Sequence, residues 1–183
     1  MDLDEYAKIQ KELAKEGVPT MTDLILGMPE ETYESILDGI CVLIESGQHN
    51  RVQFNNLSIL VNTEMGNPEY QEKYDYKIVR SKLINPHGKK TTTASGVEEY
   101  QDLVLGTNTM PPKDWAKTRS LCHMVNLIYF DKFLQIPMIV LHEVYKVSYK
   151  KQFEVIVGCA YDKLNYPIFS EIFEFFLNHA RSM

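Results

Sequence analysis

Cysteine is scarce in this 183-residue sequence, and the three cysteines that occur are far apart. Cys41, Cys122 and Cys159 are odd in number, and each has apolar neighbours. A disulfide framework needs pairs of cysteines, and a metal site needs closely spaced ligands. We therefore predict three reduced, buried thiols and no metal-binding residues.

The sequence also lacks a long hydrophobic run. Its longest apolar region, from Leu121 to Phe130, is interrupted by His123 and Asn126. A membrane-spanning helix needs about 18 apolar residues or more. The first ten residues, MDLDEYAKIQ, are acidic and unlike a signal peptide. We expect a cytoplasmic protein with no membrane partner.

Positive charge is in deficit. Lysine and arginine number 19 against 25 acidic residues, so the formal net charge is −6. A general nucleic-acid binder needs a basic surface, and this balance argues against that class. The sequence contains no Gly-x-Ser-x-Gly elbow, phosphate loop or dinucleotide fingerprint. Hydrolase, kinase and dehydrogenase functions therefore have no support from motifs.

The first 61 residues alternate between helical and strand patterns. Apolar spacing predicts helices over residues 4–16 and 33–46. Short apolar runs predict buried strands over residues 22–26 and 52–61. Helix, strand, helix and strand in this order are typical of a parallel sheet with crossover helices.

The alternation stops after residue 61. Residues 62–75 are predicted as a loop, and residues 76–84 and 98–105 as two further strands around a polar loop, 85–96. From Pro112 onward the pattern is helical. Two strand–helix units do not close a sheet. Either the later strands complete a small mixed sheet, or the chain is the tail of a larger barrel.

One segment carries a resemblance to a known family. The run Thr-Asp-Leu-Ile-Leu-Gly-Met-Pro-Glu-Glu-Thr at 22–32 resembles the fifth strand and following turn of radical S-adenosylmethionine (SAM) barrels. The run at 54–60 is similar to the sixth strand of these barrels. The Thr-Asn-Thr-Met run at 107–110, followed by Asp114 and Trp115, is similar to the start of their helical C-terminal region. The branch most similar to this chain often carries an N-terminal cobalamin-binding domain.

The resemblance implies an α/β fold in two parts. Residues 1–75 would be the last βα units of a partial TIM-type barrel, and residues 76–183 a small β element plus a mostly helical C-terminal region. In the parent family, a four-iron cluster reduces SAM, and the resulting 5′-deoxyadenosyl radical abstracts hydrogen from a small-molecule substrate. In the cobalamin-binding branch, methyl transfer or rearrangement is also expected.

The resemblance further implies five cofactor-binding positions. Asp23 would contact SAM, Ile25 would pack against the adenine, and Gly27 lies in the turn that follows. Asn55 is expected to point into the barrel lumen. The backbone of Leu57 would meet the adenine edge. The implied cofactor is SAM, and the catalytic residues are unknown.

This chain departs from the family pattern in two ways that bear on its catalytic activity. The Cys-x-x-x-Cys-x-x-Cys motif that binds the cluster is absent, and so are the first four strands. We therefore expect the chain alone to be catalytically incomplete, with the iron–sulfur cluster and cobalamin belonging to the parent enzyme. The chain would then be a truncated open reading frame, an expressed fragment or half of a split enzyme, and in the last case the missing N-terminal half, as a separate chain, is the expected partner. The alternative is a non-catalytic interaction module that pairs with a separate cluster-bearing subunit.

Two further details concern single positions. Glu30 stands where relatives usually have glycine, so the turn is expected to differ there. His123 and Asn126 lie three residues apart on one face of an apolar helix. We interpret them as a hydrogen-bonded buried pair rather than as a substrate contact.

Overall fold

A computed structural model describes residues 3–82 and 99–183, so the predicted polar loop at 85–96 lies outside the described residues. The predicted order of the N-terminal elements is confirmed. These elements are α1 (Leu3–Lys15), β1 (Met21–Leu26), α2 (Tyr33–Glu45) and β2 (Arg51–Asn56).

The strands β1 and β2 pair in parallel, with Met21 opposite Arg51 and Leu26 opposite Asn56. Successive side chains of a strand point to opposite faces, so each strand has one inward and one outward set. Val52 and Phe54 are buried, whereas their neighbours on β2 are exposed or half-buried. Among the described residues this sheet has two strands, so a mixed α/β fold is confirmed and a partial TIM barrel is not.

A second sheet begins one residue after β2. Its strands β3 (Ser58–Ile59), β5 (Tyr100–Val104) and β4 (Ile78–Lys82) are antiparallel, in that spatial order. The prediction of one continuous strand over 52–61 was therefore wrong. The predicted loop at 62–75 also contains two short helices, η1 (Glu64–Gly66) and α3 (Pro68–Lys73).

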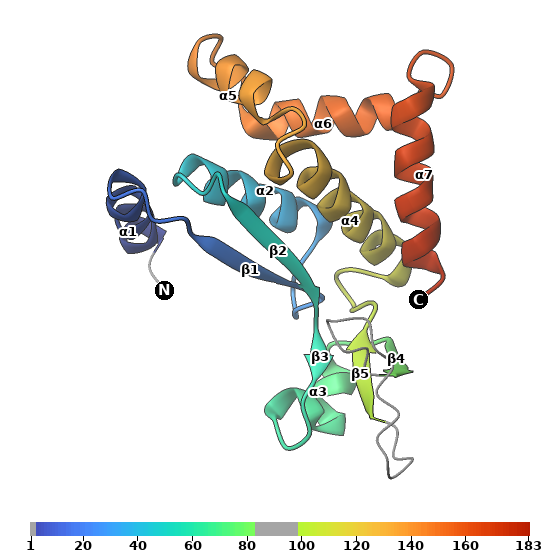
Figure 1. Cartoon of the computed structure of the whole chain (residues 1–183). Helices are drawn as coiled ribbons and strands as arrows, with labels where there is room; N and C mark the ends of the chain where they lie inside the picture. The colour runs from blue at the N-terminus through green and yellow to red at the C-terminus, as the bar shows by residue number, and fades with distance from the viewer. Residues whose placement is uncertain (1–2, 83–98) are drawn as a thin grey trace, which may run out of the picture.

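The chain passes from the first sheet to the second at Leu57, whose backbone is hydrogen-bonded to both sheets. The Leu57 N–H donates to the carbonyl oxygen of Leu26 at 2.8 Å, which continues the first sheet. Its own carbonyl oxygen accepts from the N–H of Val104 at 3.0 Å, which starts the second sheet. Figure 1 shows the small sheet as a separate group of strands beyond the ends of β1 and β2.

The C-terminal part is helical, as predicted from Pro112 onward. It consists of α4 (Pro112–Val125), a π-helical continuation η2 (Asn126–Phe130), α5 (Gln135–Glu143), α6 (Tyr149–Ala160) and α7 (Pro167–Arg181). In the described ranges, no single helix has the length and apolar character needed to cross a membrane. The segments Pro112–Phe130 and Gln135–Glu143 pass that test only together, across a bend of 85°.

The main core lies between the β1–β2 sheet and the helices α2, α4, α6 and α7. The apolar side chains of α2 form one inward stripe, and its members are all buried: Ile36, Leu37, Ile40, Leu43 and Ile44. Each such side chain contributes about 1.5–3 kcal/mol when fully buried. Trp115 and Tyr129 belong to the same core. The helices therefore cover one face of the two-stranded sheet.

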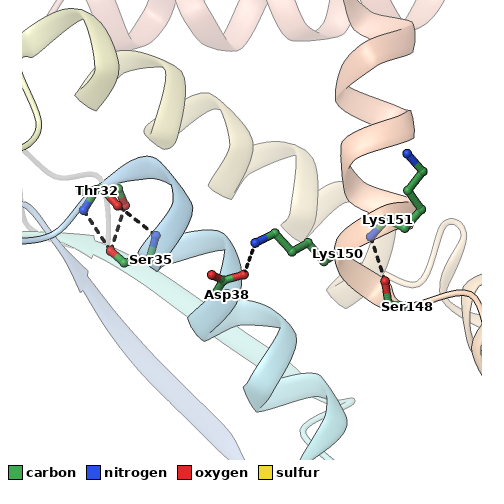
Figure 2. Close-up of polar contacts among 6 residues, drawn as sticks. All are labelled: Thr32, Ser35, Asp38, Ser148, Lys150 and Lys151. Atoms are coloured by element: carbon green, nitrogen blue, oxygen red, sulfur yellow. Dashed lines mark hydrogen bonds and ion pairs between the residues drawn. The ribbon is translucent and has the colours of Figure 1, made fainter.

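Polar contacts fix the start of α2 and its position against α6 (Figure 2). The Thr32 hydroxyl accepts from the N–H of Ser35 at 3.1 Å, and the Ser35 hydroxyl accepts from the N–H of Thr32 at 2.9 Å. This reciprocal capping box satisfies two backbone donors at a helix start. Lys150 of α6 reaches Asp38 of α2 at 2.6 Å. The capping box therefore defines the start of α2, and the exposed ion pair adds a weak contact between α2 and α6.

Candidate functional site: the open face of the β1–β2 sheet

The face of the β1–β2 sheet opposite the helices is open. Asp23 and Ile25 of β1 lie on this face, beside Gln53 and Asn55 of β2, because the parallel register pairs Asp23 with Gln53 and Ile25 with Asn55. The Ile25 side chain is 46% exposed. Three residues that the family resemblance named, Asp23, Ile25 and Asn55, are therefore together on one surface.

A row of hydrogen bonds crosses this face. The Gln53 amide donates to Asn55 Oδ1 at 3.1 Å, and Asn55 Nδ2 donates to Asp23 Oδ1 at 3.4 Å. Within the described residues, Asp23 Oδ2 has no hydrogen-bond partner from the protein. A free carboxylate oxygen is an acceptor for hydroxyl or amino groups. The face thus combines an oriented acceptor with an exposed aliphatic side chain.

The turn after β1 is tightly constrained. Gly27 has a φ of +100°, and a Cβ added there would lie 3.2 Å from the carbonyl oxygen of Val104. A side chain would therefore be strained and crowded at this position. Gly27 contributes backbone geometry to the site, at the point where the chain leaves the open face.

Glu31 organises the same turn, and the sequence reasoning missed it. Its carboxylate oxygen Oε2 accepts from the N–H groups of Gly27 at 3.1 Å and Met28 at 3.0 Å. Burial raises the pKa of the Glu31 carboxyl, and the two backbone hydrogen bonds partly offset this rise. The hydroxyl of Thr109 donates to the Glu31 carbonyl oxygen at 2.8 Å, which links the turn to the chain before α4.

Glu30 adopts the backbone conformation that the family glycine would favour. Its φ is +66°, in the left-handed region. A side chain in this region costs about 1–2 kcal/mol relative to the ordinary helical conformation. The turn therefore keeps a glycine-like backbone despite the glutamate.

Leu57 differs from Asp23, Ile25 and Asn55, because it is not on the open face. Its side chain is buried in a small cluster with Tyr76 and Val104. Its N–H is already donated to Leu26, so a ligand can use only the second lone pair of its carbonyl oxygen. The Leu57 backbone lies at the end of β1: its N–H bonds to Leu26, and its Cβ would be 3.7 Å from a Cβ added at Gly27.

The described residues do not fit an iron–sulfur cluster. Cys41 and Cys122 are buried and Cys159 is partly buried, and no two of them pair. Burial raises the pKa of the Cys41 and Cys122 thiols to about 12, which disfavours the thiolate that binds metal. In the described ranges, no group of three His, Cys, Asp or Glu residues is placed to hold a metal ion.

The prediction for His123 and Asn126 was wrong. Neither His123 Nε2 nor Asn126 Oδ1 has a hydrogen-bond partner in the described part of the chain, although both atoms are buried. Both residues line a groove of 250 Å³ between β2 and the helix pair α4–η2. Arg119 lies in the same groove and was not singled out from the sequence, because nothing in the pattern distinguishes it from a solvated helix residue.

No protein-family model matches the chain. Among curated proteins, a cobalamin-dependent radical SAM methyltransferase, TokK from Streptomyces tokunonensis, is 31% identical over 152 residues. A 2-(S-pantetheinyl)-carbapenam-3-carboxylate methyltransferase from Streptantibioticus cattleyicolor is 28% identical over 152 residues. Each match covers 83% of this chain and 22% of the relative. The chain therefore spans about a fifth of the length of the curated relatives that it matches.

Proposed function

We propose that this chain is a C-terminal part of a cobalamin-dependent radical SAM methyltransferase and that its open β1–β2 face forms part of the adenosine-binding wall. The observation that carries this proposal is the meeting of Asp23, Ile25 and Asn55 on one exposed surface. The similarity to a radical SAM methyltransferase over 83% of the chain supports it.

Each residue of the wall would have a separate role. The exposed Ile25 side chain would cover one face of the adenine ring. Asp23 Oδ2 would accept from a ribose hydroxyl, while Asn55 holds the other carboxylate oxygen in place. The Leu57 carbonyl would accept from the exocyclic amine at the adenine edge. Gly27 would keep the turn beside the ligand free of a side chain.

The iron–sulfur cluster would be held by the remainder of the longer protein. The buried, high-pKa thiols of this chain do not fit the cluster, so we assign none of its residues to the radical-forming step. When bound, the cluster supplies the electron that cleaves SAM. This chain would bind and orient the adenosine half and contribute to the wall of the substrate site.

The second candidate is a non-catalytic interaction module that pairs with a cluster-bearing subunit. The exposed apolar side chains of β1 favour it, because Met21 is 57% exposed on the same face as Ile25. Apolar patches on an open sheet face are typical of surfaces that another chain covers. In this case the chain would bind the second subunit without binding SAM.

Calorimetric titration of SAM into the purified chain separates the two candidates. We expect saturable binding that adenosine competes for and methionine does not, since the adenosine half is what this face would hold. Asp23→Ala should weaken binding at least about tenfold, as expected for loss of one charge-assisted hydrogen bond. Asp38→Ala removes the same charge on α2 and should leave affinity unchanged. Absence of SAM binding in a folded sample would contradict an adenosine wall.

A further inference from the structure

A polar groove of 250 Å³ lies between β2 and the helix pair α4–η2, and Gln53 of β2 borders both this groove and the open face. The ionisable and amide residues of the groove come from both walls: Arg51 and Gln53 from β2, Arg119 and His123 from α4, Asn126 from η2, and Asp131 just beyond. The groove is thus lined by two permanent cations and one carboxylate, in a chain whose net charge is −6. Its local charge favours an anion.

Arg119 is a largely buried cation without a counter-ion. In the described part of the chain, no carboxylate lies within 4.0 Å of its guanidinium, and Nε is buried without a hydrogen-bond partner. Burial also lowers the pKa of this guanidinium. Charges in protein interiors are normally paired, because an unpaired one is costly.

The geometry of Arg119 leaves one edge of the guanidinium available. Nη1 donates to the carbonyl oxygen of Phe54 at 2.8 Å. The Nε–Nη2 edge therefore has no acceptor within the described residues. That edge presents two parallel N–H groups, which is the fork that binds both oxygens of a carboxylate.

Two further unsatisfied groups lie on the same helix face. Arg119, His123 and Asn126 follow at spacings of four and three residues, so their side chains are neighbours along the groove. His123 Nε2 and Asn126 Oδ1 are both buried without partners. Asn126 is also the first residue of the π-helical segment η2, and such segments are frequent at functional sites.

We propose that this groove binds a small organic anion through its carboxylate group. Arg119 would pair with both carboxylate oxygens, His123 and Asn126 would hydrogen-bond to polar atoms of the ligand, and Arg51 at the exposed side would attract the negative charge. A phosphate group can use the same fork, but its additional negative charge is opposed by Asp131 in the groove. None of the five residues assigned to the adenosine wall lines the groove, although Gln53 borders both surfaces. This site therefore goes beyond the proposed function and does not depend on it.

Nuclear magnetic resonance titrations at pH 7 test the site. Succinate, inorganic phosphate and chloride are added at equal ionic strength while the Arg119 Nε–H and His123 ring signals are followed. We expect saturable shifts with succinate, weaker binding of phosphate and no saturation with chloride. Arg119→Gln should weaken succinate binding at least about tenfold. The control Arg181→Gln removes the same charge at the exposed end of α7 and should not change the affinity.

Three results would overturn the proposal. The first is the absence of saturable shifts with succinate. The second is a set of chemical-shift changes that are equal for all three anions and unchanged in Arg119→Gln. In that case the hydrogen bond to Phe54 would be the whole role of Arg119. The third is tighter binding of phosphate than of succinate, which would refute the carboxylate assignment.

A second variant covers the case in which Arg119→Gln does not fold. Arg51 is exposed on β2, so Arg51→Gln is expected to leave the urea midpoint unchanged and to weaken succinate binding several-fold through loss of local positive charge. Asp131→Asn should tighten the binding for the same reason. Unchanged succinate affinity in both variants would contradict the proposed site.

Discussion

The Nη1 atom of Arg119 lies 2.8 Å from the carbonyl oxygen of Phe54, so that a helix side chain occupies the place of a neighbouring strand beside β2. Parallel sheets extend by adding strands at free edges. On this side of β2, α4 and η2 already cover the strand, and the polar groove lies between them. A further strand of a larger sheet would therefore have to join at β1.

Replacement of Arg119 by methionine should destabilise the protein. The change removes the donor to Phe54 while keeping much of the aliphatic bulk. The change also removes the unpaired charge, which favours the variant, but it leaves the carbonyl oxygen of Phe54 without its charged donor. We expect the second effect to dominate, with a loss of about 1 kcal/mol in the free energy of unfolding, measured by urea denaturation. Arg181→Met, at the exposed end of α7, is the control and should have little effect. Equal midpoints for the two variants would show that the bond contributes nothing.

The capping box at the start of α2 gives a second prediction. Thr32→Ala removes one acceptor of the box and should lower the free energy of unfolding by about 1 kcal/mol. Thr63 precedes η1 without a side-chain cap, and its hydroxyl makes one exposed hydrogen bond, to the carbonyl oxygen of Leu60 at 2.7 Å. Thr63→Ala is therefore a matched control that removes an exposed bond but no cap, with a smaller expected cost. Urea denaturation of both variants tests this, and the reverse order of the two losses would refute it.

Glu30 and Gly17 provide a pair of opposite predictions. Both have a positive φ, +66° and +68°, a conformation that glycine adopts without steric cost. Glu30→Gly should therefore raise the melting temperature. Gly17→Ala should lower it, although the space around Gly17 is open, because only the backbone conformation is strained. Thermal denaturation followed by circular dichroism should show shifts of opposite sign, and shifts of the same sign would contradict the strain at Glu30.

The buried imidazole of His123 predicts a dependence of stability on pH. Burial, with smaller effects from Arg119 and His179, lowers the His123 pKa from 6.5 to about 4. The unfolded state therefore binds more protons between these values, and stability from this group is lost as pH falls from about 6.5 towards 4. The lowered pKa of His49 acts in the same direction, whereas the raised pKa of Glu31 acts against it.

His123→Gln isolates that contribution. Urea midpoints measured from pH 4 to pH 7 should fall less steeply on acidification in this variant than in the wild type. His142→Gln is a suitable control, since its ring lies far from Arg119 along the chain and stacks on Tyr149 instead. Parallel pH profiles for wild type and His123→Gln would refute the assignment.

Local patterns predicted most of the secondary structure. The stripe of α2 repeats at helical spacing, and Thr32 and Gly47 mark its two ends, so the helix follows from neighbouring residues alone. The position of Asp23 and Ile25 on one face of the sheet could also be predicted, because alternate residues of a strand share a face and the family motif includes both residues. What these features have in common is that they depend on short-range spacing.

The features that were missed depend on contacts between distant residues. The change of sheet at Leu57 requires a hydrogen bond from Val104, which lies 47 positions further along the chain. No glycine or proline next to Leu57 indicates a break in the strand. The role of Arg119 depends on a carbonyl of β2, which carries no sequence signal. The lack of hydrogen-bond partners for His123 Nε2 and Asn126 Oδ1 likewise depends on the packing of α4 and η2 beside β2.

The sharing of Leu57 by two sheets has a consequence for how this sequence can change over evolutionary time. One inserted or deleted residue between Asn56 and Ser58 would shift both the bond to Leu26 and the bond to Val104. The register of two sheets would then be lost in a single step. Insertions and deletions are therefore expected to be rare among homologues at this junction. They should be more frequent in the exposed segment around residues 60–64.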